Sequence, residues 1–180
     1  MMIFSSVYLP GHLFVWALYV MNVQSLALKK KFGFRKATND DVAFARKALF
    51  QNAMNPLSIS EKNLLCSYEV ISNSLVGFGQ VRQFPGGKDY ELASLYVKPV
   101  YRRQGVGSAL VGELLRRFED EHSCGSIFLL TLEPLIGFYE PFGFSVIDDI
   151  SAAPEQLQFE FKAGSIISMA LGNSIKCMCR

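Results

Sequence analysis

The sequence predicts an α+β fold in which helices flank one mixed sheet. Three observations lead to this prediction. The 180 residues are 50% hydrophobic, which is enough for one buried core. Short apolar runs typical of strands are interspersed with segments whose apolar residues have helical spacing. Neither an internal repeat nor a low-complexity block interrupts this order, so we expect a single domain built around one sheet.

The first half of the chain predicts one helix and four strands. Residues 34–36 form a short strand, and Thr38 can cap the following helix because its hydroxyl can accept a backbone N–H of the first turn. Val42 and Leu49 share the apolar face of this helix. Strand-like runs then occupy residues 64–70, 75–84 and 90–99, with turns at residues 71–74 and 85–88 between them.

The second half predicts further helices and strands. Leu110, Leu114 and Phe118 follow one another at helical spacing, so we expect a helix over about residues 107–121. Gly125 can adopt the left-handed conformation that ends many helices. Apolar strands are expected at residues 126–132 and 143–147, followed by an extended stretch, a helix over residues 164–171 and a final strand.

Cysteine and histidine are too few and too scattered to predict a metal site. The C-x-C spacing of Cys177 and Cys179 fits neither a zinc knuckle nor a redox C-x-x-C motif. The other cysteines are isolated, and buried thiols in a reducing, intracellular compartment are the simpler interpretation. His12 and His122 are the only histidines, which is little material for a metal centre or a catalytic triad. We therefore expect neither.

The net charge of +2 is unevenly distributed along the chain. Residues 1–36 carry five basic residues and no acidic one, which leaves the remainder with a net charge of −3. By charge, the body of the protein is therefore not expected to bind nucleic acid.

Residues 1–33 are interpreted as an N-terminal apolar and basic segment, and residues 34–180 as the domain. Three roles remain open for the segment. The first is an organelle-targeting stretch, which includes plastid-type import. The second is a membrane anchor formed by residues 12–28, and the third is a helix packed on the domain. No basic residue precedes its apolar run, which argues against a secretory signal. The expected location is the cytoplasm or an organelle, with a membrane tether left open.

Residues 95–118, LYVKPVYRRQGVGSALVGELLRRF, join a strand to a helix through a loop rich in glycine and arginine. Such a junction points backbone N–H groups and the positive end of the helix dipole at one place, which creates an anion site. Gly105 and Gly107 would let a pyrophosphate approach the backbone because neither has a Cβ. A Rossmann loop would need glycine at Leu110, and a Walker loop would need G-K-[ST], so neither fits. A plain strand-to-helix turn with incidental arginines is the alternative.

Two motifs resemble landmarks of the GNAT acetyltransferase superfamily. The run RRQGVG, from Arg102 to Gly107, is similar to the R/Q-x-x-G-x-G/A acetyl-CoA signature of that superfamily. The run GFYEPFGFSV, residues 137–146, is similar to its aromatic-Tyr-Glu-x-x-Gly-Phe segment. The resemblance covers about residues 34–148. It implies a GNAT-like central sheet that is splayed between its fourth and fifth strands, with acetyl-CoA bound in the gap.

The resemblance also implies which residues bind acetyl-CoA. The backbone of Leu95 and Val97, with Tyr96 between them, would contact pantetheine along the fourth strand. Leu132 stands where many members have an asparagine, so that contact with the cofactor is not carried over. The pyrophosphate would be held by the loop and the first helical turn, which comprise Arg102, Arg103, Gln104, Gly105, Val106, Gly107 and Ser108.

The resemblance further implies two residues for proton transfer. Glu91, fourteen residues before Gly105, occupies the position where some members keep a glutamate base; a solvated or paired strand carboxylate is the alternative. Tyr139 matches the tyrosine that the family uses to protonate the coenzyme thiolate; a core aromatic residue is the alternative. Glu140 and Arg82 are interpreted as structural or surface charges.

The resemblance thus implies an acetyl-CoA-dependent N-acetyltransferase in which a primary amine attacks the thioester directly within a ternary complex. The acceptor would be a protein lysine, a protein N-terminus or a small amine, which the mildly acidic body would tolerate as a cation. The alternative is an acyl-CoA-binding module with little turnover that serves as a sensor or partner.

Overall fold

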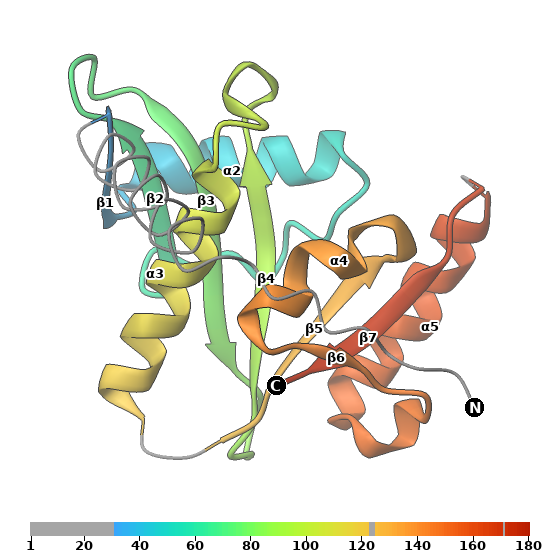
Figure 1. The fold of residues 1–180 in the computed structure, drawn as a ribbon. Coiled ribbons are helices and arrows are strands. Elements are labelled where there is room, and N and C mark those ends of the chain that lie inside the picture. The colour runs from blue at the N-terminus through green and yellow to red at the C-terminus, as the bar shows by residue number, and fades with distance from the viewer. Residues whose placement is uncertain (1–30, 123–124, 171) are drawn as a thin grey trace, which may run out of the picture.

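The computed structural model describes residues 31–122, 125–170 and 172–180. They build a seven-stranded sheet of order β1-β2-β3-β4-β5-β7-β6 (Figure 1). β4 and β5 run parallel, whereas the other neighbouring strands are antiparallel. The strands are β1 (Phe32–Lys36), β2 (Leu64–Glu69), β3 (Leu75–Gln83), β4 (Tyr90–Val97), β5 (Ile127–Leu132), β6 (Ser145–Val146) and β7 (Ile175–Cys179).

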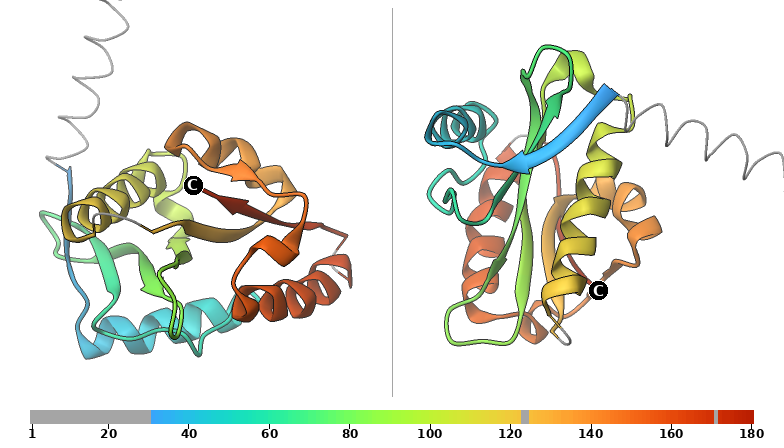
Figure 2. Two further views of the ribbon diagram at one scale, coloured as in Figure 1. Left: turned by 90° about the horizontal axis from the view of Figure 1, so that it is seen from below. Right: turned by 90° about the vertical axis from the view of Figure 1, so that its left-hand side faces the viewer.

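Helices cover both faces of this sheet, with α2 and α5 on one face and α3 and α4 on the other (Figure 2). The core follows the same division. Leu110 of α3 packs with Leu92 of β4, whereas Leu49 of α2 packs with Phe78 of β3. The α+β class, with a mixed sheet flanked by helices, is confirmed. The helices are α2 (Asn39–Gln51), α3 (Val106–Glu121), α4 (Ile136–Tyr139) and α5 (Glu155–Ala170), with short 3-10 helices η1 (Pro99–Tyr101), η2 (Glu133–Leu135), η3 (Glu140–Phe142) and η4 (Ile150–Ala152).

The start of α2 agrees with the predicted cap. The Thr38 hydroxyl accepts the backbone N–H of Asp41 at 3.3 Å, and the Asp41 carboxylate accepts the backbone N–H of Thr38 at 2.8 Å. This reciprocal pair satisfies two amides that a helix start leaves free. Asp41 also forms an ion pair with Arg35 of β1, so the same carboxylate joins the first strand to the first described helix.

β1 begins two residues before the expected domain boundary. Phe32 pairs with Glu69 of β2, and its buried ring packs with Val76 and Val106. The sheet therefore includes residues 32 and 33, which the sequence pattern assigns to the N-terminal segment. Residues 1–30, and with them the candidate membrane-binding residues 12–28, lie outside the described residues. In the described part of the chain, no helix has the length and apolar character needed to span a membrane.

β4 and β5 pair only where they start. Tyr90 pairs with Ile127 and Glu91 with Phe128, and beyond these pairs the two strands diverge (Figure 1). β4 continues along β3 while β5 continues along β7, so the facing edges of β4 and β5 have no strand partner in the described structure. This is the splayed sheet that the resemblance implies.

A β-bulge interrupts β4 inside the splayed region. The register between β3 and β4 shifts after Phe78, so that Ser94 and Leu95 stand opposite the single residue Gly79. Ser94 has a φ of 58°, which is uncommon for a residue with a side chain. The extra residue changes the alternation of the strand and brings Tyr96, rather than Leu95, to the face that carries α2.

The end of α3 corrects a detail of the prediction. The helix ends at Glu121, and His122 after it is extended, with a φ of −132°. Gly125 is therefore not the cap of α3. It has a φ of 135°, and an added Cβ would lie 2.6 Å from the Lys88 carbonyl oxygen, so glycine is needed there for close approach to the β3–β4 turn.

α5 is longer than predicted. The sequence pattern predicts an extended stretch and a helix only over residues 164–171, but the helix begins at Glu155. Pro154 opens it, and its carbonyl accepts the N–H of Leu157 at 2.8 Å. The apolar residues of α5 are not confined to one buried face, since Leu157 is buried while Phe159 is 73% exposed. The sequence of this helix therefore shows only a weak apolar period of 3.6 residues.

Candidate active site

α3 begins directly after the glycine-rich loop. Gly105 precedes the helix with a φ of 78°, a left-handed conformation that favours glycine, and no side chain caps the helix. The N–H of Ala109 reaches back to the Gly105 carbonyl at 3.0 Å. The amides of Val106, Gly107 and Ser108 consequently have no partner within the helix. These amides and the helix dipole together form a site suited to an anion.

Gly107 lies in the first turn of α3, close to two other elements. An added Cβ would lie 3.4 Å from the ring of Phe138 in α4 and 3.8 Å from Val97 of β4. The start of α3, the end of β4 and α4 therefore meet at this glycine. A larger side chain would project into the space that the three elements share.

The polar side chains of the loop are partly tied to the protein itself. Arg102 Nε donates to the Val97 carbonyl at 2.9 Å, and its guanidinium lies 5.9 Å from the ring centroid of Tyr96. Gln104 donates to the Val100 carbonyl at 2.9 Å. Arg103 is exposed and has a φ of 58°. Arg102 and Gln104 thus shape the loop, while Arg103 offers an exposed charge beside the anion site.

The backbone of β4 presents polar groups to the gap. The N–H of Lys98 donates to the Val76 carbonyl on β3, and the N–H of Tyr90 donates to the Ser126 carbonyl on the β5 side. Because the backbone groups of an antiparallel strand alternate in direction, Val97 turns its groups away from β3. Because Leu95 lies two residues before Val97 and after the extra residue of the bulge, its backbone N–H and C=O also point away from β3. An extended amide chain such as pantetheine could pair there as a strand does.

The loop and the gap together fit acetyl-CoA. Free amides at the helix start suit its pyrophosphate, and the unpaired edge of β4 suits its pantetheine. Within the described residues, no group of three histidine, cysteine or acidic side chains could hold a metal ion.

Glu91 lies where the gap closes, and it is 4% exposed. Arg82 of β3 donates from Nε to the Glu91 carboxylate at 2.6 Å and from Nη2 to Glu160 of α5 at 2.8 Å. The side chain of Arg82 is only 13% exposed. Of the two interpretations offered for Arg82, a structural charge is correct and a surface charge is wrong, since the residue joins two carboxylates inside the protein.

Burial raises the pKa of Glu91 from its ordinary value of 4.5 to about 7. The positive charge of Arg82 and its hydrogen bond lower the pKa, whereas the negative charge of Glu160 raises it further. A carboxylate with this pKa exchanges a proton near neutral pH, which is the property that a general base needs. The ion pair with Arg82 equally fits the alternative of a paired strand carboxylate.

Tyr139 is the last residue of α4, and it is 8% exposed. Its ring packs edge-on against Phe138 and Phe144, with centroids 4.8 and 6.2 Å away. Burial raises the pKa of its phenol to about 12, so the hydroxyl stays protonated at neutral pH. None of the described residues hydrogen-bonds this hydroxyl. It could therefore donate a proton, although the ring is also part of the core below α3.

The two candidate proton-transfer residues lie on opposite faces of the sheet. Tyr139 belongs to the core cluster under α3, whereas Glu91 is joined through Arg82 to α5. α3 and α5 cover opposite faces of the sheet (Figure 2). Glu140, next to Tyr139, is exposed and takes no part in either group.

Sequence reasoning missed Gln80, which lies two residues from Arg82 on the same face of β3. Gln80 is fully buried, and its side-chain amide donates at 3.2 Å to the Ser58 carbonyl and at 3.2 Å to the Ser94 hydroxyl. Its side-chain oxygen has no partner among the described residues. The sequence offered one indication of its position: Phe78, Gln80 and Arg82 alternate along an apolar strand and therefore share one face.

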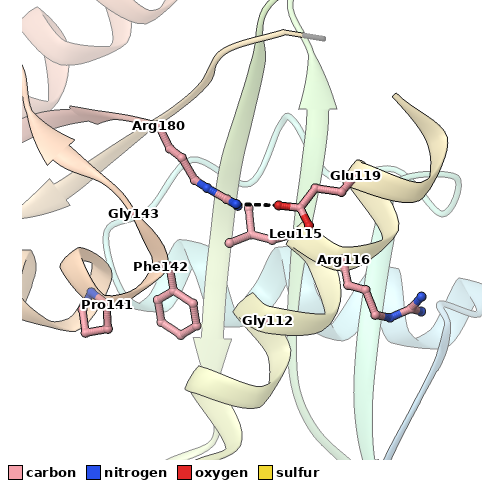
Figure 3. A pocket seen from close by; sticks show the side chains of 8 residues that line it. All are labelled: Gly112, Leu115, Arg116, Glu119, Pro141, Phe142, Gly143 and Arg180. Atoms are coloured by element: carbon pink, nitrogen blue, oxygen red, sulfur yellow. Dashed lines mark hydrogen bonds and ion pairs between the residues drawn. The ribbon is translucent and has the colours of Figure 1, made fainter. Parts of the chain in front are cut away.

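A separate open cleft of about 440 Å³ lies beside the middle of α3 (Figure 3). Arg180, the last residue, spans it to Glu119 with a 2.5 Å ion pair. Its charge is therefore already balanced, and the cleft does not include the candidate site residues. The lining residues are Gly112, Leu115, Arg116, Glu119, Pro141, Phe142, Gly143 and Arg180.

Solved structures share this fold. N-acetylglutamate synthase from Neisseria gonorrhoeae, solved with coenzyme A and N-acetyl-glutamate, matches with a TM-score of 0.64 and 16% identity over 83% of this chain and 34% of that chain. Rv2747 from Mycobacterium tuberculosis, in complex with CoA and NLQ, matches with a TM-score of 0.60 and 22% identity over 81% of this chain and 97% of that chain.

Sequence comparison identifies the family. Serotonin N-acetyltransferase of Mesocricetus auratus is 29% identical over 93 residues, which are 52% of this chain and 41% of that protein. The chain thus spans less than half the length of this relative. A family model described as the acetyltransferase (GNAT) family matches residues 36–144, more than half of the chain and both sequence motifs up to Phe144. The chain therefore belongs to the GNAT family of acetyltransferases.

Proposed function

We propose that this protein is an acetyl-CoA-dependent N-acetyltransferase that acetylates a primary amine by direct attack within a ternary complex. One observation carries the proposal. The unpaired edges of β4 and β5 open next to the free amides at the start of α3, and Glu91 lies where that gap closes. Membership of the GNAT family supports the reaction class.

The geometry supports the following binding roles. The amides of Val106, Gly107 and Ser108 would hold the pyrophosphate, with Arg103 beside them as an exposed cation. The backbone groups of Leu95 and the N–H of Val97, whose carbonyl already accepts from Arg102, would pair with pantetheine in the gap. Bound acetyl-CoA supplies an electrophilic thioester carbonyl to the acceptor amine.

Proton transfer is assigned to Glu91 and Tyr139. An alkylammonium with a pKa of about 10.4 must lose a proton before its nitrogen can form the new bond to the acetyl carbon. Glu91 accepts that proton, directly or through a water molecule. The neutral amine attacks the thioester carbonyl, and Tyr139 donates its phenolic proton to the sulfur as the carbon–sulfur bond breaks. The nitrogen loses its second proton as the amide forms, and this proton returns through water to the Tyr139 oxygen. The products are the acetylated amine and the free thiol, with Tyr139 neutral again and the first proton on Glu91. The opposite-face arrangement separates the accepting and the donating group.

The acceptor is proposed only as a class. The body of the chain carries a net charge of −3, which tolerates a cationic amine such as a protein lysine, a protein N-terminus or a small amine. The likeness to serotonin N-acetyltransferase adds arylalkylamines to the amines worth testing.

The location is proposed as intracellular, in the cytoplasm or an organelle. The thiols of Cys66 and Cys177 are buried and free of disulfides, which is typical of a reducing compartment. A membrane tether through residues 12–28 remains a separate hypothesis.

The proposal is tested by measuring free coenzyme A thiol after mixing the protein with acetyl-CoA and a panel of amines. The panel contains a lysine peptide, a peptide with a free N-terminus, a polyamine and serotonin. Amine-dependent release of the thiol is expected for at least one acceptor. The burial of Glu91 in an ion pair favours a second candidate, an acyl-CoA-binding module. Tight acetyl-CoA binding without release in any mixture would support that module and contradict the enzyme.

A further inference from the structure

One guanidinium serves two carboxylates beside the gap. Arg82 of β3 contacts Glu91 through Nε at 2.6 Å and Glu160 through Nη2 at 2.8 Å. Its Nη2 also lies 2.5 Å from the Glu91 carboxylate, so the same nitrogen is shared. The group of three carries a net charge of −1 when both carboxylates are ionised.

Glu160 is held in place by its own helix. Gln156, one turn earlier in α5, donates its side-chain amide to the Glu160 carboxylate at 3.0 Å. Leu157 of α5 is fully buried and packs with Phe128, the residue of β5 that pairs with Glu91. The position of α5 on the sheet is therefore coupled to the point where β4 and β5 separate.

We propose that Glu160 is a positioning residue for Glu91: because it shares Arg82, it limits how strongly the guanidinium holds the Glu91 carboxylate. This inference deepens the proposed function and rests on it in taking Glu91 as the base. Without Glu160, Arg82 would pair with Glu91 alone and would hold it ionised, with its lone pairs occupied. With Glu160 present, the excess negative charge is relieved when Glu91 accepts a proton.

Glu91 is the more deeply buried of the two carboxylates that share Arg82. The side chain of Glu91 is 5% exposed and that of Glu160 is 21% exposed, so loss of water penalises the charge on Glu91 more. The pKa of Glu91 is accordingly raised to about 7 by burial, opposed by Arg82 and reinforced by Glu160.

The other neighbours of Glu91 add no charge near neutral pH. On β5, its partner Phe128 is apolar. On β7, Cys177 is coupled to Glu91, but burial, with smaller contributions from Cys179 and Glu91, raises the pKa of its thiol to about 12. Arg82 and Glu160 are thus the charged groups that decide when Glu91 accepts a proton.

The test replaces Glu160 by glutamine, which removes the charge but keeps the size and an oxygen that can accept from Arg82. Glu155→Gln is the matched control, because Glu155 lies in the same helix and is exposed. Titration of the side-chain carboxyl of Glu91 by ¹³C NMR gives its midpoint directly. The pH profile of kcat/KM, measured with an acceptor found in the amine panel, gives the pH at which the acidic limb of turnover is half-maximal.

Glu160→Gln should lower the NMR midpoint of Glu91 by about one pH unit. The acidic limb of the kcat/KM profile should move to lower pH by the same amount. Glu155→Gln should move neither. Glu160→Ala, which also removes the hydrogen bond to Arg82, should lower the midpoint in the same direction and serves if the glutamine variant does not fold.

An unchanged Glu91 midpoint in the folded Glu160 variants would overturn the inference. If the NMR midpoint falls but no amine releases coenzyme A from the wild-type protein, the positioning role of Glu160 is supported while the proposed enzyme fails. If the midpoint falls and turnover shows no matching shift, Glu160 positions Glu91, but Glu91 is not the base.

Discussion

Replacing Glu91 by glutamine should make the stability of the fold less dependent on pH. The pKa of Glu91 is raised by burial from 4.5 in the unfolded chain to about 7 in the folded protein. Its protonated form is therefore favoured by folding, so this contribution to stability is complete below about pH 4.5 and is lost as the pH rises through about 7. A tenfold change in an ionisation equilibrium corresponds to about 1.4 kcal/mol, so the charge on Glu91 costs the folded state roughly 3 kcal/mol at pH 8.5.

The assay is urea unfolding of the wild-type protein and Glu91→Gln at pH 5 and pH 8.5. The difference in free energy of unfolding between the two proteins should shift in favour of the variant by roughly 2 to 3 kcal/mol between these pH values. Glu61→Gln serves as the control, because Glu61 is an exposed glutamate outside the Arg82 group. A difference for Glu91→Gln that is the same at pH 5 and pH 8.5 would refute the reasoning, since Glu91 would then be ionised throughout as an ordinary partner of Arg82.

Three further predictions concern the cofactor site, the proton donor and the N-terminal segment. Gly107→Val should weaken acetyl-CoA binding by at least about tenfold in calorimetry, because its side chain would occupy the approach beside Phe138. Gly112→Ala, in the same helix with nothing within 4 Å of its added Cβ, should leave affinity unchanged, and equal affinities would argue against the pyrophosphate site. Tyr139→Phe should slow turnover by about 10²- to 10⁴-fold and alter the alkaline limb of the pH profile, while wild-type rates would leave Tyr139 a core aromatic residue. A chain that begins at Lys30 should keep its circular dichroism spectrum and its acetyl-CoA affinity because the described sheet begins at Phe32, and unfolding would assign the removed segment to the core.

The sequence was most informative where local chemistry decides the structure. Thr38 forms the expected cap, and Asp41, three residues later, adds the reciprocal bond, so two amides are satisfied without help from the rest of the chain. The α3 helix, predicted over residues 107–121, is confirmed with its start one residue earlier at Val106. Its apolar stripe is regular, and the preceding glycine loop limits where the helix can begin.

The sequence was least informative where distant segments meet. α5 was underestimated because its exposed apolar residues hide the helical period, although Pro154 and Glu155 were a usable start signal. The pairing of Arg82 with Glu91 follows from the register of adjacent strands, which a local pattern does not specify. The approach of Glu160 to Arg82 depends on how a separate helix packs, and the two residues are 78 positions apart in the sequence.

The central claim is that acetyl-CoA lies in the gap between β4 and β5, with its pyrophosphate on the amides that begin α3. Backbone amide NMR during titration with acetyl-CoA tests this most directly. The account predicts the largest shifts at Gly105, Val106, Gly107 and Ser108, followed by Leu95 and Val97, with saturation at one equivalent. Shifts confined to the cleft around Gly112, Arg116 and Arg180, with the amides that begin α3 unmoved, would contradict it.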